Sequence, residues 1–212
     1  AQGGHNEESH NHNDVGNFIC YAFGKPLLID AGVDTYTAKT FSSQRYEIWT
    51  MQSAYHNLPL INGNQQKNGK EYKATEVSFK NSPKAFELSM ELKNAYPENS
   101  GIKTWKRSWL HQKDISITVT DDYLLQSVEN ENSWTFMCFQ IPEVLGNSFI
   151  WTINGKKARL SFPEGCKYVI ENIDFGEGRL SNSWQSNRLY RIILTPSKMK
   201  AKARVQFKIT TL

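Results

Sequence analysis

The sequence contains very little cysteine and no long apolar run, and both shortages limit the kind of protein it can be. Only Cys20, Cys138 and Cys166 are present in 212 residues, so at most one disulfide can form and one thiol must remain. Cys20 lies in an apolar segment and is expected to be a packed thiol. The sequence neither supports nor excludes a disulfide between Cys138 and Cys166. No stretch approaches the roughly 18 apolar residues of a membrane-spanning helix, so we expect no membrane partner.

Several functional signatures are absent as well. The chain has no internal repeat, no glycine-rich phosphate loop and no GxSxG sequence, and no motif groups its Ser, His and Asp residues into a triad. The formal charge is only +4, and no pattern of aromatic and basic residues typical of a nucleic-acid module is present. We therefore expect no nucleic-acid partner, whereas the mild positive charge favours acidic ligands.

The residues that are plentiful favour β-structure. The hydrophobic content of 39% is low but sufficient for a core, and it includes 11 Phe, 9 Tyr and 6 Trp, which suit sheets better than helices. A β-sandwich of 212 residues often folds as one unit. We therefore expect a single domain over residues 1–212.

Apolar and polar residues alternate in the middle of the chain, as they do in strands with one buried face. The two clearest runs consist of Phe86, Leu88, Met90 and Leu92, then Ile115, Ile117 and Val119. The adjacent acids Asp121 and Asp122 follow the second run and are interpreted as a turn. Because such runs recur with turns between them and no convincing long helix interrupts them, the pattern predicts an all-β, antiparallel β-sandwich.

Other segments are assigned by composition. Two nearly continuous apolar strands are expected between Val15 and Asp30, joined by a turn at Gly24 and Pro26. Residues 34–44 and 181–187 are rich in Ser, Thr or Asn and are expected to be loops. Further strands are predicted at residues 134–142, 148–155, 156–162, 167–175 and 188–196.

Histidines gather near the start of the chain. Three of the five histidines lie in the segment 4–14, which reads GHNEESHNHND. In an extended segment alternate side chains share a face, so His10, His12 and Asp14 would point the same way. An HxH pair is also a common pattern on a polar edge strand, and residue types alone leave that alternative open.

A metal site can be assembled from this segment and two later residues. Asp30 ends the apolar run PLLID, where a buried carboxylate needs a cation or several donors, and His56 follows in SAYHNLP. Imidazole and carboxylate are ligands that zinc accepts, and three protein ligands leave a fourth position open. The residues therefore indicate a zinc site formed by His12, Asp30 and His56, with His10 free beside it.

Three ordered motifs carry a resemblance to a known family. They are GHNEESHNHNDVGNF, LLIDAGVDTYT and SSQRYEIWTMQSAYHNLPLING, which together lie in about the first third of the chain. They resemble the β-sandwich part of the heparinase II/III family of polysaccharide lyases, which follows a helical toroid in that family. The metal and cleft motifs of the resemblance lie within residues 4–62.

The resemblance implies roles for individual residues. It implies that His12, Asp30 and His56 bind zinc, that His10 faces the substrate in the cleft, and that Tyr46 is the cleft tyrosine. Tyr36 competes with Tyr46 for that last role. The implied chemistry is β-elimination at a uronic acid of an acidic polysaccharide, such as a heparin-like or heparan sulfate-like glycosaminoglycan or alginate. The implied location is periplasmic or secreted.

The family also implies a partner within the parent protein. Its members carry a helical domain that supplies the principal tyrosine, its partner histidine and an asparagine, and this sequence has almost nothing before the first motif. The expected partner is therefore the missing N-terminal helical domain, and the isolated chain is expected to be inactive without it. The zinc would then be chiefly structural, holding the segment with His10 against the sheet.

Aromatic and basic residues provide candidates for sugar contacts. Trp49 lies near His56, where an aromatic face can stack on a sugar ring or simply pack. In IKTWKRSWL, Trp105, Arg107 and Trp109 share a strand face, and an arginine between two indoles can grip a sulfate or carboxylate. The alternative is that the guanidinium is packed, or reaches a carboxylate across the sheet.

Two other functional classes remain open at this point. A non-catalytic carbohydrate-binding sandwich needs the same fold without the chemistry. A cupin-like metal enzyme also uses HxH, an acid and a later histidine on a β-scaffold, but Asp30 follows His12 by 18 residues rather than a few, which disfavours that class.

Overall fold

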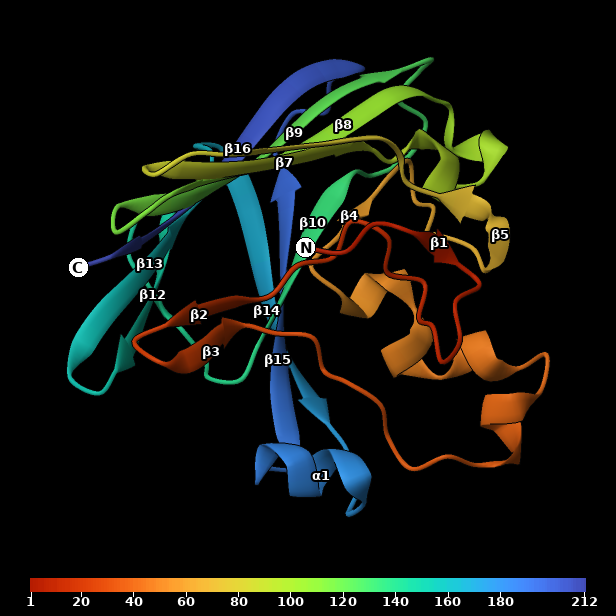
Figure 1. Cartoon of the computed structure of the whole chain (residues 1–212), viewed down its shortest axis with the longest axis horizontal. Helices are drawn as coiled ribbons and strands as arrows, with labels where there is room; N and C mark the ends of the chain where they lie inside the picture. Colours follow the sequence, from red (N-terminus) through yellow and green to blue (C-terminus); the bar gives the residue numbers. More distant parts are fainter.

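The computed structural model describes all residues from 1 to 212, and its framework is two facing antiparallel β-sheets (Figure 1). The larger sheet has eight strands in the order β11-β12-β13-β16-β9-β8-β7-β6. The bounds of its strands are β6 Thr75–Asn81, β7 Ala85–Glu91, β8 Ile102–Gln112, β9 Ser116–Leu125, β11 Glu143–Val144, β12 Ser148–Ile153, β13 Lys156–Ser161 and β16 Lys202–Thr211.

The second sheet has four strands in the order β14-β15-β10-β4, and two small strand pairs complete the set. Its strands are β4 Pro59–Leu60, β10 Ser133–Cys138, β14 Cys166–Asp174 and β15 Arg188–Pro196. The small pairs join β1 (His5–Asn6) to β5 (Gly69–Lys73) and β2 (Cys20–Ala22) to β3 (Lys25–Leu28). The predicted all-β antiparallel sandwich is confirmed. No helix has the length and apolar character needed to cross a membrane.

Large aromatic residues fill the space between the sheets. Trp105 of β8 stacks on Tyr123 of β9, with ring centroids 4.3 Å apart and an interplanar angle of 8°. Trp134 of β10 packs against Phe207 of β16, with ring centroids 5.7 Å apart, and so joins the two sheets. Trp105 and Trp134 are almost completely buried. This packing follows from the strand period of two, which turns alternate side chains of each strand inward.

The N-terminal third packs around the smaller sheet. A second apolar cluster contains Ile29, Ala31, Met137 and Leu189. The backbone N–H of Ile29 donates to the carbonyl of Met137 at 2.9 Å, which fixes the segment after β3 against β10. Between β3 and β4 the chain forms four short 3-10 helices: η1 Ala38–Phe41, η2 Arg45–Glu47, η3 Trp49–Met51 and η4 Ser53–Tyr55. Two more, η5 Lys93–Ala95 and η6 Glu98–Ser100, precede β8.

The first sixty residues are less regular than predicted. Residues 15–19 form no strand, and the two long strands expected up to Asp30 are reduced to the short β2–β3 hairpin. Its turn lies at Phe23 and Gly24, both with positive φ (52° and 76°), rather than at Pro26, which pairs within β3. Two successive positive φ angles are typical of a tight hairpin turn. His10, with φ of 61°, also lies outside any extended strand.

The structure also differs from the predicted turn at Asp121 and from the predicted loop at residues 181–187. Asp121 and Asp122 lie inside β9 and not in a turn, because Asp121 is directly opposite Arg107 of β8. The expected loop at residues 181–187 contains part of a short helix, α1 (Arg179–Trp184), at the lower end of the view in Figure 1. All three cysteines are free thiols, and Cys20 is packed in the core as predicted.

Candidate metal centre

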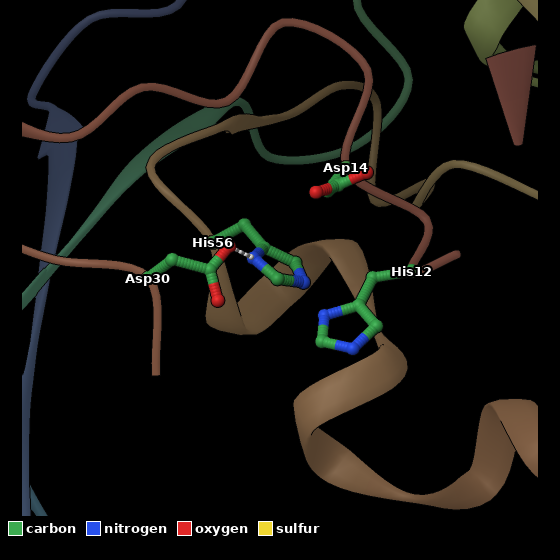
Figure 2. A group of neighbouring side chains, drawn as sticks. All are labelled: His12, Asp14, Asp30 and His56. Carbon is green, nitrogen blue, oxygen red and sulfur yellow. Dashed lines mark ion pairs between the residues drawn. The ribbon is translucent and has the colours of Figure 1, made fainter. Parts of the chain in front are cut away.

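Four side chains with metal-binding groups meet beside the sandwich. His12 and Asp14 come from the irregular segment between β1 and β2, Asp30 follows β3, and His56 follows η4. One ligand atom from each lies within 4.8 Å of those of the other three (Figure 2). The structure therefore brings together the three predicted ligands, His12, Asp30 and His56. It adds Asp14, which was expected only to share a face with His10 and His12.

Asparagine side chains hold these segments together. Asn57, next to His56, donates from Nδ2 to the carbonyls of Phe18 at 2.6 Å and Ile29 at 3.0 Å. Its Oδ1 accepts from the backbone N–H of Met137 at 2.7 Å. Because Asn57 is completely buried, these bonds are shielded from water and fix three distant parts of the chain.

Asn17 has a similar role closer to the ligands. Its Nδ2 donates to Oδ2 of Asp30 at 2.8 Å, and its Oδ1 accepts from the backbone N–H of Asn57 at 2.9 Å. The second oxygen of Asp30 accepts from the backbone N–H of Gly32 at 2.8 Å. Such partners orient a ligand before the ion arrives. Sequence reasoning missed Asn17 and Asn57, whose only signal was their place within the motifs around the histidines.

Burial and mutual charge set the protonation of the two histidines. Burial, together with the charge of His56, lowers the pKa of His12 to about 4, so its imidazole is neutral near neutral pH. Burial alone would lower the pKa of His56, but the hydrogen bond and charge of Asp30 raise it. The carboxylate of Asp30 thus favours the protonated form of His56, and a bound cation would compete with that proton.

The pKa values of the two carboxyl groups, Asp14 and Asp30, are shifted in opposite directions. Burial raises the pKa of Asp14 to about 6. Burial would also raise the pKa of Asp30, but the hydrogen bond and charge of His56 lower it overall. One buried acid is therefore already compensated by a histidine, whereas Asp14 lacks a comparable cation and gains most from a metal ion.

The geometry fits a zinc-like ion. Nδ1 of His56 lies 3.2 Å from Oδ2 of Asp30. Two donors on one tetrahedral zinc are about 3.3 Å apart, as follows from zinc–ligand distances near 2 Å. His56 is completely buried, and its Nε2 has no hydrogen-bond partner. A neutral His12, the His56 and Asp30 pair and Asp14 form a donor set of nitrogen and oxygen that suits such a cation.

His10 lies outside the cluster and is exposed. Its Nδ1 is 3.3 Å from the hydroxyl of Tyr36, and the two rings stack at 6.1 Å with an interplanar angle of 12°. Tyr46, predicted as the cleft tyrosine, is half-buried and hydrogen bonds through its hydroxyl to the side chain of Asn11 at 3.2 to 3.3 Å. The structure thus pairs His10 with Tyr36, the competing candidate.

The predicted substrate contacts of Arg107 and Trp105 are wrong, because both side chains are buried between the sheets (1% and 0% exposed). Arg107 binds Asp121 through Nε at 2.8 Å and Nη2 at 2.7 Å. The indole N–H of Trp105 donates to the same carboxylate at 3.0 Å. The alternative considered from the sequence, a carboxylate reached across the sheet, is the one observed.

Trp49 is half-buried and packs on other aromatic rings. Its ring lies 5.3 Å from that of Tyr55 and 6.3 Å from that of Phe175. This packing holds η3 and η4, and so His56, against the end of β14. A sugar contact of Trp49 stays a prediction.

Fold and site together define an antiparallel β-sandwich domain with a candidate metal centre at the side of its smaller sheet. Comparison with protein families gives a match to the model described as "Heparinase II/III-like, C-terminal" over residues 1–202. The chain belongs to this family, which confirms the resemblance. It also removes the basis for the cupin-like alternative.

Solved structures agree on the fold. A heparan sulfate lyase from Pedobacter heparinus superposes with a TM-score of 0.75 at 14% identity, and the match covers 98% of this chain and 32% of that one. A heparinase III gene product gives a TM-score of 0.69 at 14% identity, covering 100% and 32%. The chain thus spans about a third of the length of these structures. Comparison with curated proteins gives no significant match.

Proposed function

We propose that this chain is the β-sandwich domain of a polysaccharide lyase that cleaves uronic-acid-containing polysaccharide by β-elimination. In this proposal it contributes a zinc site and one wall of the cleft. The observation that carries the proposal is the position of His10. Its imidazole is exposed next to the hydroxyl of Tyr36, two residues away from a ligand of the buried cluster. The two candidate acid–base groups are thus exposed, whereas His12, Asp14 and His56 of the cluster are buried.

The chemistry requires a proton to move between a sugar carbon and a sugar oxygen. A base removes the proton beside the uronate carboxylate, the bond from the neighbouring carbon to the glycosidic oxygen breaks, and that oxygen receives a proton. A carbon–carbon double bond remains in the sugar. His10 and Tyr36 are in contact and exposed, so they can exchange a proton with a sugar bound above them. Tyr46 is the second candidate for the tyrosine.

Zinc, when bound by His12, Asp30 and His56, would supply a fixed positive charge that holds three chain segments together. Holding His12 in place also positions His10, because His12 is two residues further along the same segment. We therefore assign the ion a structural role. This assignment separates the variants: His12→Ala should lose the metal, whereas His10→Ala should keep it and lose activity.

Because the chain covers only 32% of the solved lyases, we propose that a further, helical domain of the parent protein provides the opposite wall of the cleft. Substrates of this kind, such as heparan sulfate-like glycosaminoglycans or alginate, are polymers outside the cytoplasm. A periplasmic or secreted location is part of the proposal.

The test is a lyase assay. The chain and the full-length protein encoded by its gene are incubated separately with heparan sulfate, chondroitin sulfate and alginate, and the ultraviolet absorbance of the unsaturated product is followed. The proposal expects product from the full-length protein, and His10→Ala should abolish it. Tyr36→Phe and Tyr46→Phe then decide which tyrosine matters. Saturable binding without product would favour the non-catalytic carbohydrate-binding module instead.

A further inference from the structure

The short helix α1 brings an arginine to Tyr36, the partner of the exposed His10. Arg179 is the first residue of α1, and Leu180 and Trp184 attach this helix to the domain. Leu180 is buried, and the indole N–H of Trp184 donates to the carbonyl of Ala31 at 2.9 Å. The position of Arg179 is therefore set by the fold, although 143 or more residues separate it in sequence from the segment that it contacts.

Arg179 meets this segment at Tyr36. Its backbone N–H donates to Oγ1 of Thr35 at 3.2 Å, and its guanidinium lies 5.6 Å from the ring centroid of Tyr36. Phe41 packs edge-on against the same ring at 5.6 Å, so Tyr36 is held on two sides. His10, Tyr36 and Arg179 thus form one exposed group built from three separate parts of the chain.

The guanidinium of Arg179 has no acidic partner. It forms neither a salt bridge nor a side-chain hydrogen bond. By contrast, Arg188, the first residue of β15 after this helix, pairs with Asp174. The nearest acid of the contacted segment, Asp34, uses Oδ1 to accept the backbone N–H of Thr35 at 2.7 Å. An arginine that stacks on a ring keeps its N–H donors free, and its planar fork matches carboxylate and sulfate groups.

We propose that Arg179 is a substrate-binding residue that holds an anionic group, carboxylate or sulfate, of a sugar next to the one at His10. This inference rests on the proposed function and deepens it. A sugar at His10 and Tyr36 leaves a neighbouring ring of the polymer over Arg179, where the unpaired guanidinium offers two parallel hydrogen bonds. Binding at this position would also set the register of the polysaccharide in the cleft.

The test compares two matched substitutions, Arg179→Gln and Arg188→Gln, in the 212-residue chain and in the full-length protein. Calorimetry of the chain uses two probes, an unsulfated heparosan oligosaccharide and a sulfated heparin oligosaccharide of the same length. Loss of one charge-assisted pair corresponds to about tenfold weaker binding, and this is the expected change in Kd for Arg179→Gln. Arg188→Gln should bind like the parent, and Arg179→Lys should recover part of the loss.

The two probes identify the group that is held. Equal loss with both means that Arg179 holds the carboxylate, and a loss confined to the heparin probe means that it holds a sulfate. In the full-length protein Arg179→Gln should raise KM with the melting temperature unchanged. An unchanged Kd and KM would overturn the proposal while leaving the proposed function intact. If His10→Ala also retains full activity, the proposed function itself fails.

Discussion

Arg107 and Asp121 face each other across β8 and β9 as a bidentate ion pair that is sealed inside the sandwich. Nε and Nη2 of the guanidinium lie 2.8 and 2.7 Å from the two carboxylate oxygens, and neither residue is more than 1% exposed. The remaining nitrogen, Nη1, donates to the carbonyl of Asn57 at 2.8 Å and to that of Gly16 at 3.3 Å. One ion pair thus connects the larger sheet to the segments that carry His12 and His56.

Removal of the Asp121 carboxylate should strongly destabilise the folded protein. Asp121→Ala leaves the guanidinium buried without a counter-charge and removes the acceptor of two indole N–H groups. We expect the free energy of unfolding to fall by about 3–5 kcal/mol, measured by urea denaturation. The control is Asp174→Ala, which breaks the exposed pair with Arg188 and should leave the unfolding free energy close to that of the parent. Similar losses in both variants would contradict the special role of the buried pair.

The pairing of Arg107 with Asp121 has no signal in the local sequence. Alternation at residues such as Leu88 and Met90 predicts β7 well, because a strand shows its period locally. Two adjacent acids such as Asp121 and Asp122 also fit a turn, and only the cross-strand register reveals that Arg107 lies opposite. Register depends on the whole sheet and leaves no local mark.

The candidate metal centre was predicted better than its surroundings. His12, Asp30 and His56 were identified by residue type and by the resemblance, and they meet as expected. Asn57 was missed because its partners, at Phe18 and Ile29, are far away in sequence. The arginine at Tyr36 was missed for the same reason, since no pattern links α1 to the segment after β3.

Removal of the metal should loosen the N-terminal segments. If the centre binds zinc as proposed, a chelator should lower the melting temperature of the zinc-loaded chain by about 5–10 °C, which corresponds to a ligand present at about 100 times its Kd. His12→Ala should melt at the lower temperature with or without chelator, and His10→Ala should respond like the parent. A melting curve that chelation does not change would count against a structural ion.

Stability should also decline at alkaline pH because of two buried thiols. Burial raises the pKa of Cys20 to about 11 and that of Cys138 to about 12. Between pH 9 and these values the unfolded chain has released thiol protons that the folded chain retains. The contribution of the two thiols to the free energy of unfolding is therefore fully present below pH 9 and is lost as the pH rises. Each thiol contributes a slope of up to about 1.4 kcal/mol per pH unit.

The check is urea denaturation of the parent and of Cys138→Ala at several pH values from 8 to 10.5. Other groups titrate in the same range, so the comparison is between slopes. The variant is expected to be less stable at pH 8 because it loses a packed side chain, but its stability should fall less steeply with pH. Parallel curves would mean that the thiol of Cys138 ionises as easily in the folded protein as in the unfolded one.

Asp14 decides whether the metal shell is open or closed. With His12, Asp30 and His56 as the only ligands, a tetrahedral ion keeps one position for water, whereas a carboxylate from Asp14 completes the shell, as in structural zinc sites. The buried carboxylate of Asp14 lies within 4.8 Å of the other donors, and its Oδ1 is oriented by the side-chain amide of Gln2 at 2.8 Å. This geometry favours the closed shell.

Asp14→Asn keeps the shape of the side chain and removes its charge, so zinc affinity should fall by about tenfold or more. Cobalt substituted for zinc should also show a changed visible spectrum, because its coordination shell loses an anionic oxygen. Asp34→Asn, outside the cluster, is the matched control and should alter neither measurement. If Asp14→Asn binds both ions like the parent, the fourth position belongs to water.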